Sequence, residues 1–195
     1  MSVTIVVGKR HLLAGLSLLV LTALIGVALV VPAISDASTT YHTRSASCPG
    51  LDFLPMNGTS DYESSDALRG GFNTQQTLFR CNADLPTGAI VTQVQFTLVI
   101  SYPGSDPITC LLTRNSLAAT ANSGSYQAMA GPLTLTPVST DNNTTYRLSD
   151  STITDPTVDD ANYAYFLECS MGKDIAPGDG ILGADVIYKI STANG

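Results

Sequence analysis

The chain has 195 residues, of which only 13% are charged, and its formal net charge is −7 at pH 7. This length fits one domain with its own hydrophobic core after a short leader. Because the chain is acidic and its basic residues beyond position 35 stand singly, the sequence argues against nucleic acid and anionic lipid as partners. Those basic residues are Arg44, Arg69, Arg80, Arg114, Arg147, Lys173 and Lys189.

The first 35 residues have the pattern of an export segment. Lys9-Arg10-His11 precedes an uncharged apolar run over residues 12–34, which predicts a helix followed by exported residues. Small residues at positions 33–37 offer cleavage sites and favour a signal peptide that is removed. However, the run of 23 residues is longer than a signal peptide core of roughly 7–15 residues and suits a membrane anchor. Both alternatives stay open, and both make the protein extracytoplasmic, either secreted or held at the cell surface.

Residues 36–47 differ from the apolar run before them because they are mostly Ser, Thr and Ala with single charges. This composition predicts a flexible stalk. The folded domain is then expected over residues 48–195, starting at Cys48-Pro49-Gly50. Without residues 1–35, seven Lys and Arg would remain against sixteen Asp and Glu, a net charge of −9.

The strongest element of the sequence is the stretch 85–101. Leu85-Pro86-Thr87-Gly88 is a turn signal, and an alternating run comes directly after it. Alternation with a period of two predicts a strand that buries one face and exposes the other. The residues predicted to face inward are Ile90, Val94, Phe96, Leu98 and Ile100.

Turn clusters and short apolar runs alternate along the rest of the chain. The runs predict further strands at residues 77–81, 108–113, 125–129, 133–138, 146–148, 163–171 and 181–190. Amphipathic helices, which a parallel α/β fold needs between its strands, are not evident in the pattern. The sequence therefore predicts an all-β fold, an antiparallel, jelly-roll-like β-sandwich of about eight strands after one N-terminal apolar helix.

Four cysteines, Cys48, Cys81, Cys110 and Cys169, occur in the domain expected to be exported. Four cysteines allow three sets of pairs, and an oxidising compartment favours disulfides over free thiols, zinc or redox chemistry. We favour Cys48 with Cys81, which flank the early loops, and Cys110 with Cys169, which lie on apolar strand faces.

Few residues of the domain suit catalysis. A Ser/His/Asp or Cys/His arrangement needs a histidine near the nucleophile, and His42 lies in the predicted stalk. A carboxylate pair, as in glycoside hydrolysis, remains an alternative because sixteen acidic residues are present. The sequence therefore predicts a protein that is not an enzyme and holds no cofactor.

Calcium is the one metal with a candidate site, because it binds several hard oxygen ligands from one or two loops. The candidate ligands are four aspartates of one acidic segment, Asp150, Asp155, Asp159 and Asp160. Asp174 and Asp179 form a second candidate. The alternative interpretation is that these aspartates bond their own backbone in turns.

Three motifs carry a resemblance to a known kind of domain. Leu85-Pro86-Thr87-Gly88-Ala89, the segment from Thr157 to Tyr165 and Val186-Ile187-Tyr188 resemble a β-sandwich domain of many uncharacterised exported bacterial proteins. The resemblance covers residues 78–190 and implies the fold. It implies no catalytic residues, and it does not extend to the cysteines or the apolar segment.

These observations predict an exported, non-enzymatic surface or extracellular module that binds, adheres or assembles with copies of itself. Its partner would be a glycan, a protein or a second copy. One alternative is a domain that binds or cleaves carbohydrate through carboxylates. The other is an accessory subunit of a membrane complex, anchored by residues 12–34.

Overall fold

The computed structural model describes residues 39–56, 62–64, 68–70, 76–118, 126–176 and 178–192. The regular elements among these residues are antiparallel strands, apart from one three-residue 3-10 helix at Gly50–Asp52. Within the described ranges, no helix has the length and apolar character needed to cross a bilayer. The helix predicted in residues 1–35 lies outside the described residues.

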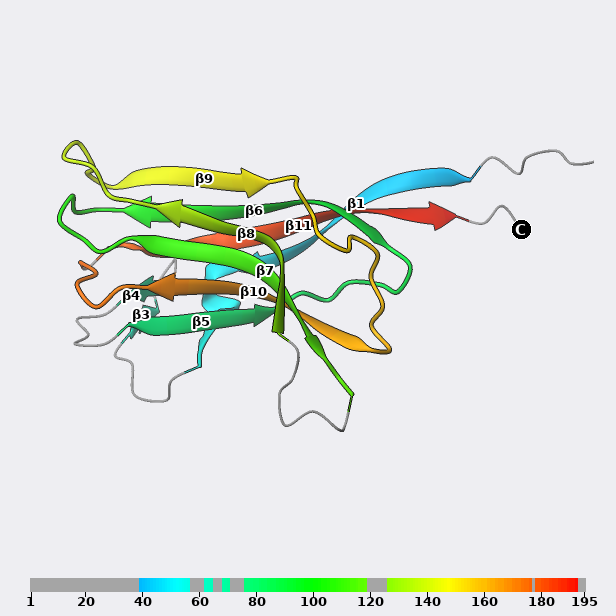
Figure 1. Cartoon of the computed structure of the whole chain (residues 1–195). Helices are drawn as coiled ribbons and strands as arrows, with labels where there is room; N and C mark the ends of the chain where they lie inside the picture. The colour runs from blue at the N-terminus through cyan, green and yellow to red at the C-terminus, as the bar shows by residue number, and fades with distance from the viewer. Residues whose placement is uncertain are drawn as a thin grey trace, which may run out of the picture. The chain divides into compact units, whose positions relative to one another are not determined.

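The strands form two sheets (Figure 1). In one sheet the order is β3-β4-β11-β6-β9, and β1 also pairs with β11. In the other the order is β2-β5-β10-β7-β8. The bounds are β1 Thr40–Pro49, β2 Leu54–Pro55, β3 Tyr62–Ser64, β4 Leu68–Gly70, β5 Thr77–Asn82, β6 Ile90–Ile100, β7 Ile108–Ser116, β8 Tyr126–Leu135, β9 Thr144–Asp150, β10 Tyr163–Met171 and β11 Gly180–Thr192.

The eight long strands pair in a nested order. β7 pairs with β8, β6 with β9, β5 with β10 and β1 with β11. Strands that are far apart in the sequence therefore lie side by side, and the first strand is the partner of the last. Along the chain, each pair of strands is therefore enclosed by the next pair outward.

One hydrophobic core takes side chains from both sheets, as expected for a β-sandwich-like fold. Phe96, Leu98 and Val186 in the first sheet and Leu112 and Leu167 in the second are all at most 1% exposed. The period-two alternation of β6, β7 and β10 is thereby confirmed over most of their length.

Two bulges shift the predicted inward faces. In the pairing of β6 with β11, one residue near the start of β6 is skipped. Val91 is therefore in the core, while Ile90, predicted to face inward, is half-buried. A second shift in β11 lies between Ile181 and Gly183. As a result Ile181 is fully buried, while Leu182 is half-buried. A bulge adds one residue to one strand, and this reverses the facing of every residue beyond it.

The flexible stalk predicted for residues 36–47 is wrong for residues 40–47, which belong to β1. This strand pairs with β11 over its ten residues, from Thr40 opposite Thr192 to Pro49 opposite Gly183. Composition does not reveal the strand because most of its side chains remain exposed and its order comes from backbone hydrogen bonds. Residues 36–38 lie outside the described ranges.

The strands predicted at 125–129 and 133–138 form the single strand β8. The chain passes through Gly131-Pro132 without leaving the sheet, because the pairing with β7 shifts between Cys110 and Leu112. Gly131 has a φ of +89°, which glycine adopts readily. Its amide, unused by the ladder, donates to a carboxylate oxygen of Asp150 at 2.9 Å.

Candidate functional site

The structure contains two disulfides, Cys48–Cys81 and Cys110–Cys169, which confirms the favoured pairing. Cys110 and Cys169 lie directly opposite each other on β7 and β10, with Cα atoms 4.1 Å apart, and both are fully buried. This disulfide joins neighbouring strands of one sheet. Its burial keeps it away from solvent reductants.

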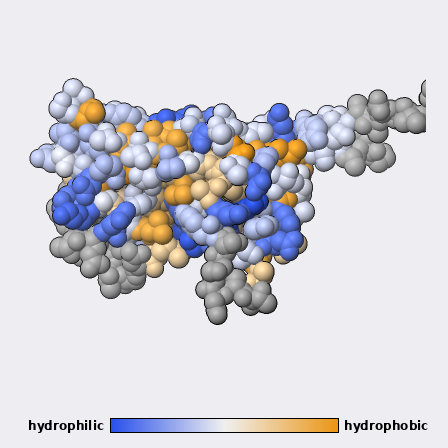
Figure 2. Space-filling model, viewed as in Figure 1, coloured by the Kyte–Doolittle hydropathy of each residue, from blue (hydrophilic) through white to orange (hydrophobic). Residues whose placement is uncertain are grey.

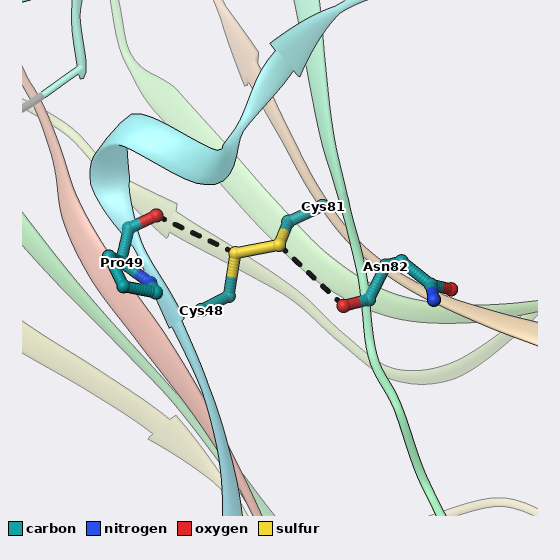
Figure 3. Close-up of a disulfide and its surroundings, with 4 residues drawn as sticks. All are labelled: Cys48, Pro49, Cys81 and Asn82. Atoms are coloured by element: carbon teal, nitrogen blue, oxygen red, sulfur yellow. Dashed lines mark hydrogen bonds between the residues drawn. A yellow bond between two sulfur atoms is a disulfide. The ribbon is translucent and has the colours of Figure 1, made fainter.

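The other disulfide joins the two sheets, because Cys48 is in β1 and Cys81 is in β5. Figure 3 shows each sulfur beside the backbone carbonyl of the next residue, Pro49 or Asn82, at 3.6 Å. Since oxidised sulfurs carry no hydrogen, these are sulfur–oxygen contacts rather than true hydrogen bonds. The disulfide holds the first strand against the opposite sheet.

The four aspartates of the acidic segment have separate partners within the chain. Asp150 accepts from the amides of Gly131 and Thr152, and these two bonds hold its pKa below the ordinary value. Asp155 pairs with Arg114. The carboxylate of Asp159 accepts from the side chain of Asn162, while the amide of Asp160 donates to the hydroxyl of Thr87.

No three His, Cys, Asp or Glu residues in the described ranges are placed to share a metal ion. The second candidate pair is also divided. The Asp174 side chain is 69% exposed and lies 3.9 Å from Lys173, whereas Asp179 is completely buried. Of the four carboxylates in the acidic segment, Asp150 bonds backbone amides, as the turn interpretation expects, whereas Asp155 and Asp159 contact side chains.

Arg114, in β7, is the centre of a polar cluster at one end of the second sheet. Its Nε donates to the side-chain oxygen of Gln127 at 2.8 Å, and its Nη2 contacts a carboxylate oxygen of Asp155 at 2.5 Å. The guanidinium lies over the ring of Tyr163, 4.5 Å from the centroid. The arginine is thus held by β8, by the acidic segment and by β10.

A cleft of about 450 Å³ opens beside this cluster, lined by Arg114, Asp155, Pro156, Thr157, Asp159 and Tyr163. The position of Asp159 beside the cleft is fixed by Tyr165, which is buried. The Tyr165 hydroxyl accepts a hydrogen bond from the Asp159 amide at 2.7 Å. Burial also raises the pKa of this phenol. The cleft combines one cation, two carboxylates, a hydroxyl and an aromatic ring on a fixed frame, which we name the Arg114 cleft.

A second charged cluster is buried on the face of the second sheet that points away from the core. Glu168 is 1% exposed although its neighbours Leu167 and Cys169 face the core. Its carboxylate contacts Arg80 at 2.5 Å and accepts from the Tyr126 hydroxyl at 2.9 Å. The Arg80 guanidinium lies 4.6 Å from the Phe166 ring centroid. We name this set the Glu168 cluster.

Sequence reasoning did not find the Glu168 cluster. The alternation of residues 163–171 places Glu168 on the polar face, where solvent exposure is the ordinary expectation. Its partners come from β5 and β8, far away in the sequence, and no local pattern marks them. The only available signal was a lone glutamate between two strongly apolar neighbours.

Tyr126 gives a prediction that can be measured by pH titration. Partial burial, followed by the hydrogen bond to Glu168, raises its pKa to about 12. The folded pKa lies above the ordinary value of 10, so the neutral form is favoured in the folded state. The stability from this contact is therefore expected to be complete below pH 10 and lost as the pH rises towards 12.

Ultraviolet absorbance at 295 nm reports tyrosine ionisation directly. One phenol should ionise near pH 12 in the wild type and at lower pH in Glu168→Gln, because the substitution removes the negative charge beside Tyr126. Tyr102→Phe is the comparison variant, because it removes a different phenol that is also more than half exposed. An unchanged titration in Glu168→Gln would contradict the assignment.

The histidine in the described ranges, His42, lies in β1 opposite Ile190. It is exposed and is not among the residues that line the Arg114 cleft. All four cysteines are in disulfides. The described residues therefore bring no histidine or thiol to the Arg114 cleft or the Glu168 cluster.

No protein family model matches the chain, and comparison with curated proteins finds no match. Similar solved structures include a family two carbohydrate esterase from Cellvibrio japonicus, with 8% identity and a TM-score of 0.33 over 79% of this chain and 35% of that one. The structure of infectious bursal disease virus Gx strain has 15% identity and a TM-score of 0.31, over 78% and 33%. The chain spans about a third of the length of each. Likeness at this level does not bear on function, and the resemblance to exported bacterial domains stays a prediction.

Proposed function

We propose that this protein is an exported, non-enzymatic surface or extracellular module built on a jelly-roll β-sandwich. The nested pairing of its eight long strands is the order expected of a jelly roll. The observation that carries export is the pair of buried intramolecular disulfides, because such bonds form and persist in oxidising compartments. The export segment predicted in residues 1–35 agrees with this proposal.

Non-reducing mass spectrometry of the protein recovered from its native host tests this part. We expect both disulfides intact, with the protein in the medium or on the cell surface. Four alkylatable thiols would overturn the proposal. Immunoblotting of cells and medium distinguishes a cleaved secreted form from an anchored one, and co-purification of stable partners in detergent would favour an accessory subunit of a membrane complex.

The binding surface of the module is the Arg114 cleft. Figure 2 shows the viewed face with apolar residues in separate groups between polar ones, rather than in one broad apolar area, as is usual for a surface that is not an obligate interface. The cleft instead offers hydrogen-bond donors and acceptors beside an aromatic ring. This mixture suits a ligand rich in hydroxyl groups, which favours carbohydrate binding as the specific activity.

A glycan array with the full chain tests carbohydrate binding. Thr157 is exposed on the rim of the cleft, so Thr157→Trp should fill the cleft without disturbing Arg114 and reduce binding at least tenfold. Thr136→Trp, at an exposed site after β8, is the matched control and should bind like the wild type. Binding that survives Thr157→Trp, or no binding to any glycan, would reject this cleft as a carbohydrate site.

Glycoside cleavage remains a separate alternative because it needs two carboxylates on either side of the scissile bond. A reducing-sugar assay over a panel of polysaccharides distinguishes it from binding alone. We expect no turnover. Turnover that a single substitution at Asp155 or Asp159 abolishes would show that the protein is an enzyme.

A further inference from the structure

A buried carboxylate lies at the end of the sandwich, directly before β11. Asp179 is completely buried. One of its oxygens accepts a hydrogen bond from the amide of Ser101, whereas Oδ2 has no hydrogen-bond partner. Because a buried polar oxygen without a partner is costly, this atom is placed to gain from contact with a further group.

Ser101 connects this carboxylate to a second side-chain oxygen. The Ser101 hydroxyl donates to the side-chain oxygen of Asn143 at 2.7 Å. Asn143 has a φ of +53°, in the left-handed region that asparagine tolerates better than most residues. Three segments meet here: the residue after β6, the turn before β9 and the residue before β11.

We propose that Asp179, Asn143 and Ser101 form a calcium site. Calcium binds carboxylate, amide and hydroxyl oxygens, together with backbone carbonyls and water, and a positive ion supplies the partner that Oδ2 lacks. A site with a single carboxylate binds weakly, in the millimolar range found in extracellular modules. This site is separate from the Arg114 cleft and does not depend on what that cleft binds.

The structure also explains why Asp174 does not belong to this site. Its amide donates to an Asp106 carboxylate oxygen at 3.2 Å, and its carbonyl accepts from the Asp106 amide at 3.1 Å. These bonds fix the neighbouring loop, while the Asp174 carboxylate remains exposed. The calcium ligand is therefore expected to be Asp179, and Asp174 supports the loop.

The test is thermal unfolding of the full-chain protein, first treated with EDTA and then titrated with CaCl₂ to 10 mM. When calcium exceeds the dissociation constant tenfold, the wild-type Tm should rise by about 3–6 °C. Asp179→Asn should abolish the rise. Asp159→Asn, in the acidic segment, is the matched control and should retain it, while MgCl₂ should produce a smaller rise than CaCl₂.

Asn143→Ala is a second variant, which removes one neutral ligand. It tests the calcium site if Asp179→Asn does not fold. It should weaken the apparent calcium affinity several-fold, as measured by isothermal titration calorimetry. A wild-type protein with neither a Tm shift nor a heat of binding at 10 mM calcium would overturn the proposal. A shift lost in Asp159→Asn and kept in Asn143→Ala would overturn it in favour of the acidic segment.

Discussion

Replacing Cys110 and Cys169 together by alanine is expected to lower the free energy of unfolding by about 4 kcal/mol. The disulfide closes a loop with a sequence separation of 59 residues, and opening it lets the unfolded chain gain conformational entropy. Both sulfurs are in the core, so the variant also loses packing there. Urea unfolding measures this change in the free energy of unfolding. In thermal unfolding, the same loss should lower the Tm by roughly 8–16 °C for a domain of this size.

The Cys48→Ala/Cys81→Ala variant is the informative comparison. The loop that this disulfide closes is shorter, with a sequence separation of 33 residues. The expected loss of stability is nearly the same, about 4 kcal/mol, because the entropy of loop closure grows only with the logarithm of loop length. Here amide exchange should accelerate in β1, which otherwise pairs only with β11. A loss below about 1 kcal/mol in both double variants would contradict a stabilising role for the disulfides.

Glu168→Leu is expected to lower the free energy of unfolding by about 3 kcal/mol, since it leaves the partly buried guanidinium of Arg80 without its carboxylate. Removing both charges with Arg80→Met/Glu168→Leu should restore most of the loss, because a pair of apolar side chains leaves no charge unpaired. Urea unfolding of the three proteins measures the difference.

The exposed pair of Lys173 and Asp174 is the matched control for the Glu168 cluster. Its side chains are 63% and 69% exposed and 3.9 Å apart, so Lys173→Ala/Asp174→Ala should change stability by less than about 1 kcal/mol. If the double variant at Arg80 and Glu168 proved no more stable than Glu168→Leu, the cost would come from lost packing. The unpaired charge would then not be its cause.

The compositional and periodic signals predicted the parts of the fold that depend on local alternation. Leu98, Leu112 and Leu167 are buried as their positions in alternating runs require, because side chains on a strand point to opposite faces in turn. The favoured cysteine pairing came from the same reasoning, since Cys110 and Cys169 both occupy inward positions. Candidate sites were less predictable, because their residues come from strands that are distant in the sequence.

By itself, the sequence determined the all-β class, the inward faces of the alternating runs away from bulges and the chemistry available to a site, because these depend on residue type and a period of two. Only the tertiary structure decided that residues 40–47 are a strand, that bulges bring Val91 and Ile181 into the core, and that Glu168 and Asp179 are buried. Each of these depends on a partner many residues away. Backbone pairing and burial between distant segments leave no mark in the local pattern, so the packed molecule alone reveals them.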